Sequence, residues 1–309
     1  MTADTPISAP PADTRCAFVA LIGAPNVGKS TLVNALVGSK VTIVSPKVQT
    51  TRTLVRGIAI EGTSQLVLVD TPGIFAPRRR LDRAMVTTAW TGAHDADMVA
   101  LMVDAKLGID DGADAILTKL KDVAARKILI LNKVDLVAKL GLLALTQEAN
   151  ARGDFAATFM VSALTGDGVG EVRAWLAANA PQGPWHYPED QISDAPLRSL
   201  AAEITREQLF NRLHQELPYR STVETDVWKE LRGGAVRIEQ TIYVERESQR
   251  KIVLGKGGAS IKAIGAAARA EIAKIIEQPV HLFLFVKVRE HWGDDPERYR
   301  EMGLDFPRE

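Results

Sequence analysis

An eight-residue segment after the first apolar run constrains this chain more than any other feature. Residues 23–30 read Gly-Ala-Pro-Asn-Val-Gly-Lys-Ser and match the pattern G-x-x-x-x-G-K-[ST]. The run Cys16–Ile22 before it predicts a buried strand, and Lys29–Leu36 after it predicts a helix. Gly23 and Gly28 permit a backbone whose successive N–H groups point into one cavity, where the helix dipole adds positive potential. We therefore expect an α/β fold with a phosphate-binding loop between its first strand and first helix.

Further apolar runs predict a doubly wound, mostly parallel sheet with helices on both faces. Val, Leu and Ile crowd these runs with little polar alternation, which is typical of strands buried on both faces. The runs are Gln65–Val69, Met98–Val103, Lys127–Leu131 and Phe155–Val161. The predicted helices between and after them are Asp82–Thr91, Asp111–Ala125, Leu140–Asn150 and Gly170–Ala178.

Two motifs predict contacts to phosphates and Mg²⁺. Lys29 would place its ammonium between the β- and γ-phosphates, and Ser30 would offer its hydroxyl to Mg²⁺. Asp70 ends a strand, where a carboxylate is costly unless it serves a cation, so we expect it to hold Mg²⁺ through water; an ordinary Asp-Thr-Pro-Gly turn is the alternative. The Gly73 N–H would meet the γ-phosphate. The full predicted set is Gly23, Ala24, Pro25, Asn26, Val27, Gly28, Lys29, Ser30, Thr31, Asp70, Thr71, Pro72 and Gly73.

Two later motifs predict recognition of guanine. Asn132-Lys-Val-Asp135 follows a predicted strand, and the Asp135 carboxylate can accept both N–H groups on one edge of guanine, which adenine does not offer. Lys133 would lay its stem over the base, and Asn132 would brace the phosphate loop. In Ser162-Ala163-Leu164 the Ala163 N–H would donate to the guanine O6. This last motif is weak alone, because small residues after a strand are common.

The second part of the chain changes pattern after a proline-rich stretch. Pro181, Pro184, Pro188 and Pro196 predict a linker, because such density disfavours helix and ladder. The order expected after it is α-β-β-α-α-β, in which Val236, Ile238, Ile242 and Val244 share one strand face. The segments are Leu197–Glu216, Thr222–Lys229, Ala235–Glu245, Ile252–Leu254, Ala259–Glu277 and Val280–Val288.

Composition limits the class of protein. Lys plus Arg total 38, and Asp plus Glu also total 38. A nucleic-acid partner therefore cannot be inferred from the net charge, and only a local basic patch could support one. The single cysteine, Cys16, excludes an intramolecular disulfide and fits a reducing compartment. No apolar run approaches the roughly 18 residues that cross a bilayer, and residues 1–15 do not resemble a signal peptide. We expect a cytoplasmic monomer with a disordered tail over 1–15.

The motif set looks like a translation-factor-class bacterial GTPase, and the second part narrows the resemblance. Val253-Leu-Gly-Lys-Gly-Gly258 resembles the GxxG loop of a type II KH domain, and Lys287–Gly293 followed by Tyr299 resembles the C-terminal segment of the Era family. This implies a GTPase (G) domain over 16–181, a linker over 182–196, a smaller α+β KH domain over 197–288 and a C-terminal tail over 289–309. It also implies GTP hydrolysis with GTP/GDP and Mg²⁺ bound, coupled to binding the 3′ end of 16S rRNA during maturation of the 30S ribosomal subunit. Some peripheral association with the inner membrane is a further implication.

The resemblance assigns an RNA-binding loop in the second part. Residues 246–270 carry six basic side chains and one acidic one, Glu247. In a KH domain the glycines would let the loop approach the phosphates of single-stranded RNA. The alternative is a Gly-rich turn capping a helix whose lysines face solvent. The predicted RNA contacts are Arg250, Lys251, Gly255, Lys256, Gly257, Gly258 and Lys262.

Three catalytic expectations also depend on the resemblance. In related GTPases a threonine of the segment Val48–Arg52 ligates Mg²⁺ with GTP bound, and we prefer Thr51 over Thr50, either of which could be an ordinary loop residue. Ile74 stands where Ras-type enzymes carry a glutamine that orients the attacking water, so we expect slow hydrolysis. Asn26 would hold a K⁺ ion beside the phosphates, or would simply favour the turn. The predicted catalytic contributors are Lys29, Thr51, Gly73 and Asn26.

Other functions compete with a GTPase switch. One is an RNA-binding assembly factor that holds GTP structurally with negligible turnover. Another is a tRNA-modification GTPase, but those enzymes end in a catalytic cysteine motif, and no cysteine follows Cys16. A membrane-acting GTPase is the least favoured, since no anchor segment is evident.

Overall fold

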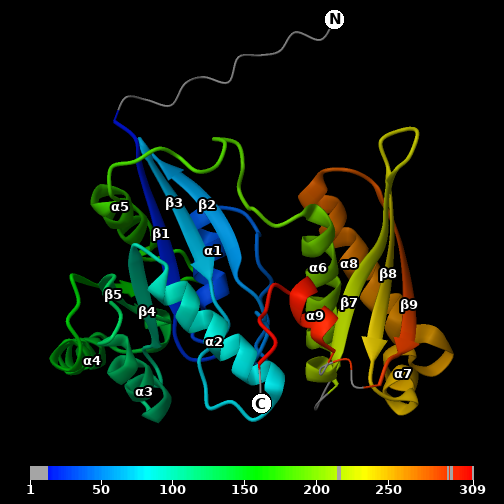
Figure 1. The fold of residues 1–309 in the computed structure, drawn as a ribbon, viewed down its shortest axis with the longest axis horizontal. Helices are drawn as coiled ribbons and strands as arrows, with labels where there is room; N and C mark the ends of the chain where they lie inside the picture. Colours follow the sequence, from blue (N-terminus) through cyan, green and yellow to red (C-terminus); the bar gives the residue numbers. More distant parts are fainter. Residues whose placement is uncertain (1–12, 214–216, 291, 293–294, 308–309) are drawn as a thin grey trace, which may run out of the picture.

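The first half of the chain, β1 to α5, is built on a six-stranded sheet (Figure 1). The computed structural model describes residues 13–213, 217–290, 292 and 295–307, so most of the expected N-terminal tail lies outside the described residues. The strand order is β2-β3-β1-β4-β5-β6. The strands are β1 Arg15–Ile22, β2 Val55–Glu61, β3 Ser64–Asp70, β4 Met98–Asp104, β5 Arg126–Asn132 and β6 Ala157–Val161.

Strand β2 was not predicted, and it makes the sheet mixed. It pairs antiparallel with β3, whereas every other pair in this sheet is parallel. Gly57 in its middle hides the strand in the sequence, because glycine weakens strand propensity. A Cβ at Gly57 would lie 2.7 Å from Val37 Cγ2, so the glycine lets the first helix approach the sheet.

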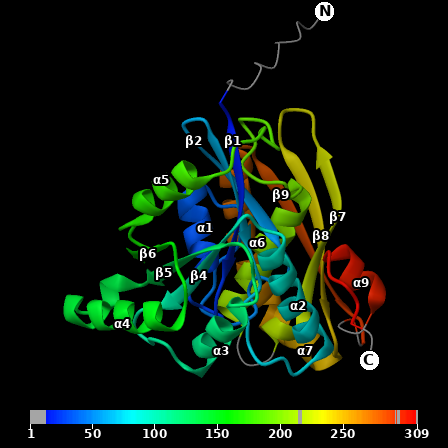
Figure 2. The same ribbon diagram turned by 60° about the vertical axis from the view of Figure 1, so that its left-hand side comes forward.

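Helices cover both faces of this sheet, as expected (Figure 2). Apolar residues of α1 and α5 share one core cluster, and those of α2, α3 and α4 share the other. The bounds are α1 Lys29–Val37, α2 Arg80–His94, α3 Asp111–Leu120, α4 Lys139–Arg152 and α5 Val169–Asn179. Helix α3 ends five residues before the predicted Ala125, because the chain turns back to bury Val123 in the core before β5.

The second half, α6 to β9, has the predicted α-β-β-α-α-β order. Helices α6 and α8 cover one face of a sheet ordered β7-β8-β9, and the predicted inward face of β8 is buried. The bounds are α6 Leu197–Arg212, β7 Ser221–Glu230, β8 Val236–Val244, α7 Glu247–Leu254, α8 Ala259–Ile276 and β9 Val280–Val288.

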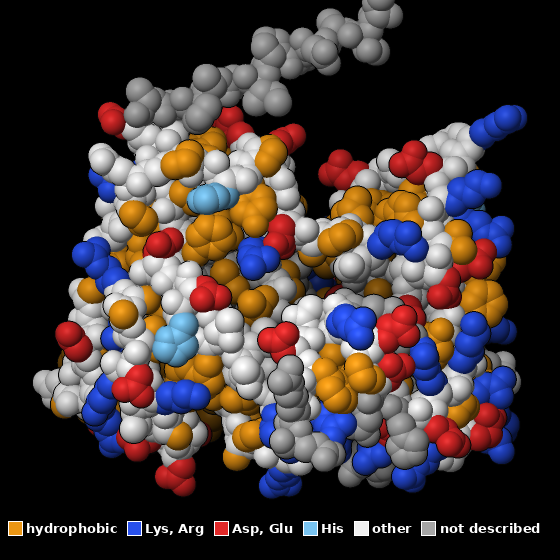
Figure 3. Space-filling model, in the orientation of Figure 1, with side chains coloured by type: hydrophobic (Ala, Val, Ile, Leu, Met, Phe, Trp, Pro, Cys, Tyr) orange, Lys and Arg blue, Asp and Glu red, His pale blue; other side chains and the backbone are white. Residues whose placement is uncertain are grey.

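Two segments outside the sheets bind to the first half. The proline-rich stretch forms two isolated antiparallel β-bridges with strands of the first sheet. One joins Gln182 to Arg15, and the other joins Ser193 to Gly57. The segment expected as a C-terminal tail contains α9, Pro296–Glu301, and buries Trp292 and Tyr299 with residues of α2. A hollow separates the two halves in the upper part of Figure 3. Among the described helices, none has the length and apolar character needed to cross a membrane.

Candidate functional site

A cavity of about 500 Å³ lies at the carboxyl edge of the first sheet. The strand register brings the predicted motifs together there, since Asp70 pairs with Leu21 and Asn132 pairs with both Asp104 and Val161. The predicted residues that line the cavity are Pro25, Asn26, Gly28, Lys29, Ser30, Thr31, Thr51, Thr71, Gly73, Asn132, Lys133, Asp135, Ser162, Ala163 and Leu164. Gly23, Ala24, Val27, Asp70 and Pro72 are not among the lining residues.

The phosphate loop needs its glycines. Gly28 has φ 97°, and a Cβ there would lie 2.2 Å from the Asn132 amide nitrogen. A Cβ at Gly23 would lie 2.5 Å from the Met102 carbonyl oxygen. Because both neighbours are fixed parts of the sheet edge, only glycine fits these positions.

Lys29 is buried at the start of α1 with its ammonium turned into the loop. Its Nζ donates to the carbonyl oxygens of Gly23 at 3.2 Å and Ala24 at 3.1 Å. Burial lowers the pKa of Lys29 to about 8, and the charge of Asp70 opposes that shift. A buried ammonium held only by carbonyls is a group that a phosphate would satisfy far better.

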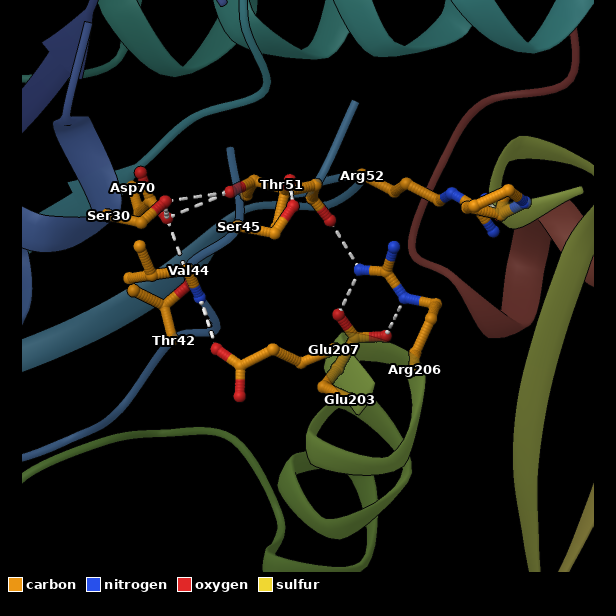
Figure 4. A network of polar contacts seen from close by, with 12 residues as sticks. Ser30, Thr42, Val44, Ser45, Thr51, Arg52, Asp70, Glu203, Arg206 and Glu207 are labelled. Atoms are coloured by element: carbon orange, nitrogen blue, oxygen red, sulfur yellow. Dashed lines mark hydrogen bonds and ion pairs between the residues drawn. The ribbon is translucent and has the colours of Figure 1, made fainter. Parts of the chain in front are cut away.

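Three hydroxyl groups converge on one oxygen of Asp70 (Figure 4). Asp70 Oδ2 accepts from Ser30 at 2.6 Å, Thr42 at 2.9 Å and Thr51 at 3.2 Å, and the Ser30 and Thr51 hydroxyls lie 2.9 Å apart. The structure thus places Thr51 in this cluster. The Thr50 hydroxyl instead bonds to the Ser45 hydroxyl and to the Lys47 carbonyl, so it stabilises the local loop rather than joining the Asp70 cluster.

The same cluster fits a divalent cation. Asp70 Oδ1 is buried and finds no hydrogen-bond partner among the described residues. Burial raises the pKa of Asp70, whereas the Ser30 hydrogen bond and the Lys29 charge lower it. Carboxylate and hydroxyl oxygens are the ligands that Mg²⁺ takes, so the unpaired oxygen and the adjacent hydroxyls match its chemistry.

The loop after β3 approaches the phosphate loop closely. A Cβ at Gly73 would lie 2.9 Å from Pro25 Cα, and the Ile74 N–H donates to the Gly23 carbonyl at 3.0 Å. The Ile74 side chain is buried in the core cluster beneath α2 and α3.

The predicted base-binding motifs hold one another in place. Asn132 Nδ2 donates to the Val27 carbonyl at 2.7 Å, which is the expected brace. Its Oδ1 accepts the Ala163 N–H at 2.9 Å, so a guanine O6 would have to share that donor. Lys133 Nζ contacts Asp104 at 2.6 Å and the Asn26 carbonyl at 2.8 Å. The Asp135 side chain is exposed at the cavity.

Asn26 has the backbone conformation expected of its turn role. Its φ of 64° lies in the left-handed region, which asparagine tolerates in turns. Its Nδ2 donates to the Pro46 carbonyl at 2.9 Å and joins the phosphate loop to the loop before β2.

The KH-like loop also depends on its glycines. Gly255, Gly257 and Gly258 have φ values of 71°, 60° and 79°. A Cβ at Gly255 would lie 2.7 Å from Ser260 Cβ. Lys251, Lys256 and Lys262 are exposed around this loop, whereas Arg250 already donates to the Val286 carbonyl and pairs with Glu247.

The sequence interpretation missed several residues at the site. Asp104 ends β4 as Asp70 ends β3, a signal that could have identified it. Thr42 has no comparable signal, because a fold-dependent loop brings it to Asp70. Asn34 is equally inconspicuous in the sequence, yet its side chain binds the backbone of Val41 and Thr42 and fixes the start of that loop.

Comparisons with known proteins agree with this geometry. The family described as 50S ribosome-binding GTPase matches residues 18–133, and the KH domain family matches residues 216–293. The GTPase Era of Afipia carboxidovorans is 73% identical over 296 residues, covering 96% of each chain. That of Rhizobium meliloti is 66% identical over 305 residues, covering 99% of this chain and 97% of the relative.

Two solved structures resemble the whole chain. One is a variant of Aquifex aeolicus Era bound to GDP and aluminium fluoride, and the other is Era with Mg²⁺, GDPNP and nucleotides 1506–1542 of 16S ribosomal RNA. Each is 36% identical, has a TM-score of 0.89, and matches 94% of this chain and 99% of its own.

Proposed function

The chain belongs to the Era family of GTPases, and we propose that it is a switch whose nucleotide state sets RNA binding by its second half. The ligand proposed for that half is the 3′ end of 16S rRNA, and the process is assembly of the 30S subunit. A monomeric state is an expectation from the sequence, and peripheral membrane association is an expectation from the resemblance.

The observation that carries the nucleotide assignment is the Ser30–Thr51–Asp70 cluster at the cavity. Mg²⁺ bound there would neutralise charge on the phosphate oxygens. Ser30 and Thr51 would hold the ion directly, Asp70 would act through water, and Lys29 would turn from the loop carbonyls to the phosphates. The Gly73 N–H would contact the γ-phosphate.

Slow hydrolysis follows from the loop after Gly73. The Ile74 side chain is apolar and buried in the core, so it cannot orient a water molecule. Another group has to complete the site for fast turnover. We keep K⁺ at Asn26 as the candidate, with the turn role as its alternative.

The RNA assignment is supported by the exposed lysines around three glycines that all have positive φ. A loop without side chains at these positions can approach a phosphate backbone closely. The solved Era complex with a 16S rRNA fragment supplies the ligand class.

Calorimetry with GTP, GDP and ATP in Mg²⁺ buffer tests the nucleotide assignment. We expect tight binding of both guanine nucleotides and none of ATP. Asp135→Asn should reduce GTP affinity by at least about 100-fold, because its amide cannot accept both guanine donors. Equal affinity of the parent protein for GTP and ATP would overturn the proposal.

A further inference from the structure

The loop that carries Thr51 lies between the nucleotide site and helix α6 of the second half. We call residues 40–52 the switch loop. Figure 4 shows Arg206 and Glu207 of α6 facing this loop from the side opposite Asp70. The loop therefore has two sets of contacts, one in each half of the molecule.

The α6 contacts are made by two buried side chains, Arg206 and Glu207. Glu207 Oε1 accepts the Val44 N–H at 2.7 Å, and its Oε2 pairs with Lys40 at 2.5 Å. Arg206 Nη2 donates to the Thr50 carbonyl oxygen. Glu207 is 4% exposed and Arg206 is 1% exposed, so both α6 side chains are shielded from water, although their partners Lys40 and Val44 are partly exposed.

The two sets of contacts alternate along the chain. Thr42 binds Asp70, and two residues later the Val44 N–H binds Glu207. At the other end, the Thr50 carbonyl binds Arg206, and Thr51 binds Ser30 and Asp70. Thr50 and Thr51 are adjacent, with Cα atoms about 3.8 Å apart, and Val44 is two residues from Thr42, so only one or two peptide units separate each α6 contact from a hydroxyl of the Asp70 cluster.

Apolar packing reinforces the same junction. Ile43, between these contacts, is 1% exposed and packs in the core of the second half with Ile204 of α6 and Ile238 of β8. Lys47 Nζ donates to the Phe210 and Leu213 carbonyls at the end of α6. The switch loop is thus fixed along most of its length by the second half.

The junction also has a cost. Arg206 Nη1 and Arg52 Nε are buried and have no hydrogen-bond partner among the described residues. Unpaired buried donors disfavour this arrangement. We expect the junction to open more readily when the contacts of Thr42 and Thr51 with Asp70 no longer fix the switch loop.

We propose that Arg206 and Glu207 are positioning residues for Thr51 and Thr42, so that the second half sets the affinity of the site for GTP with Mg²⁺. This rests on the proposed switch function and names the contacts that carry it. The γ-phosphate state is the one that orders such a loop through Mg²⁺, whereas GDP leaves it released. Loss of the α6 contacts therefore weakens GTP binding and leaves GDP binding intact.

The test measures the affinities of the full chain for GDP and for a non-hydrolysable GTP analogue over a Mg²⁺ titration. In Glu207→Ala and Arg206→Ala we expect GTP-analogue affinity to fall about tenfold or more, with a higher Mg²⁺ requirement, and GDP affinity to stay within about twofold. Glu207→Gln keeps an oxygen that can accept the Val44 N–H, so it should retain most of the parent affinity. Arg212→Gln on the same helix is the matched control, since its side chain is exposed and bonds to Gln208.

Hydrogen exchange without nucleotide supplies a second readout. Peptides spanning the switch loop should exchange faster in both alanine variants than in Glu207→Gln or Arg212→Gln, while the β8 peptides stay protected. If an alanine variant does not fold, Lys47→Met is the substitute, because it removes the switch-loop donor to the carbonyls at the end of α6. It should lower the affinity for the GTP analogue relative to GDP, as the alanine variants do.

Two outcomes would overturn the positioning role. Equal losses of affinity for GDP and the GTP analogue would show a structural role only, and affinities for both ligands equal to those of the parent would show that α6 does not position the loop. Either result leaves the proposed function standing. A parent protein that binds neither guanine nucleotide would instead remove the proposed function itself.

Discussion

Single residues at the site are held in states that a phosphate ligand and a cation would relieve. Lys29 is a buried ammonium bonded to two carbonyls, and Asp70 keeps one buried oxygen without a partner among the described residues. Both groups lower the stability of the protein itself. This is the expected pattern where a function opposes stability.

Replacing Lys29 by methionine should stabilise the nucleotide-free protein at pH 7 by about 1–3 kcal/mol while abolishing nucleotide binding. The pKa of Lys29 is lowered to about 8, from an ordinary value of 10.5, by burial. Between these values the unfolded chain holds a proton that the folded chain has lost, so the parent gains stability as pH rises through this window. The advantage of Lys29→Met should therefore shrink from pH 7 to pH 10. Urea unfolding of both proteins in EDTA measures the difference, and a variant less stable at both pH values would contradict this account.

Asn26 has two predicted roles, favouring a turn or holding K⁺, and the variant Asn26→Gly distinguishes them. If its side chain holds K⁺, GTP turnover should be about tenfold faster in K⁺ than in Na⁺, less than the effect of an arginine finger. Asn26→Gly keeps the left-handed backbone but removes the amide, so the stimulation should disappear while nucleotide binding persists. Turnover of the parent that is identical in the two salts, or stimulation that survives in Asn26→Gly, would leave only the turn role.

At the scale of elements, the sequence predicted those strands that are marked by a continuous run of apolar residues. Long buried runs revealed five of the six strands of the first sheet, and the strand Val280–Val288 matches β9 at both ends. β2 was missed because Gly57 disguises it, and its pairing with β3 depends on a turn rather than on a helical crossover. The site motifs fall at the predicted strand ends for the same local reason.

The contacts of the switch loop could not be predicted from the sequence. Ile43 and Arg52 look like ordinary loop residues, but Ile43 is buried in the other half and Arg52 donates to the Ser221 and Pro218 carbonyls. These contacts depend on how two separately folded cores meet, and no periodicity encodes that. The packing of the C-terminal segment was not predicted for the same reason, since Trp292 is buried in a cluster with residues of α2 that are distant in sequence.

The KH-like loop should bind RNA mainly through phosphates. Lys256→Gln with Lys262→Gln removes two exposed cations beside the loop, so we expect about tenfold weaker binding and a salt dependence shallower by about 1.4 in log–log slope. Lys229→Gln, an exposed change near the C-terminal end of β7, is the control. Figure 1 shows the β7–β8 turn at the end of the sheet away from α7. Fluorescence anisotropy with a single-stranded RNA at several salt concentrations measures both quantities. An unchanged slope in the double variant would assign the RNA to another surface.

At the scale of the whole molecule, the switch loop joins the cavity at the first sheet to the half that carries the KH-like loop. The switch loop contacts the Asp70 cluster on one side and α6 on the other, and Trp292 lies within a cation–π distance of Arg52, 5.5 Å from guanidinium carbon to ring centroid. If the proposed switch function holds, a ligand that favours one arrangement of the junction should change the affinity of the half on the other side for its own ligand.

This coupling has to be reciprocal in binding free energy. If a GTP analogue raises the affinity for a 16S rRNA 3′-end fragment by some factor, the fragment must raise the affinity for the analogue by the same factor, for which we expect about 5- to 150-fold. Ile43→Ala removes apolar packing between the loop and the second half, so it should bring both factors toward one while each ligand still binds alone. Calorimetric titrations in both orders give the two factors directly. Factors near one in the parent protein would mean that the halves bind their ligands independently, and the junction would then be a structural contact rather than the link between GTP and RNA.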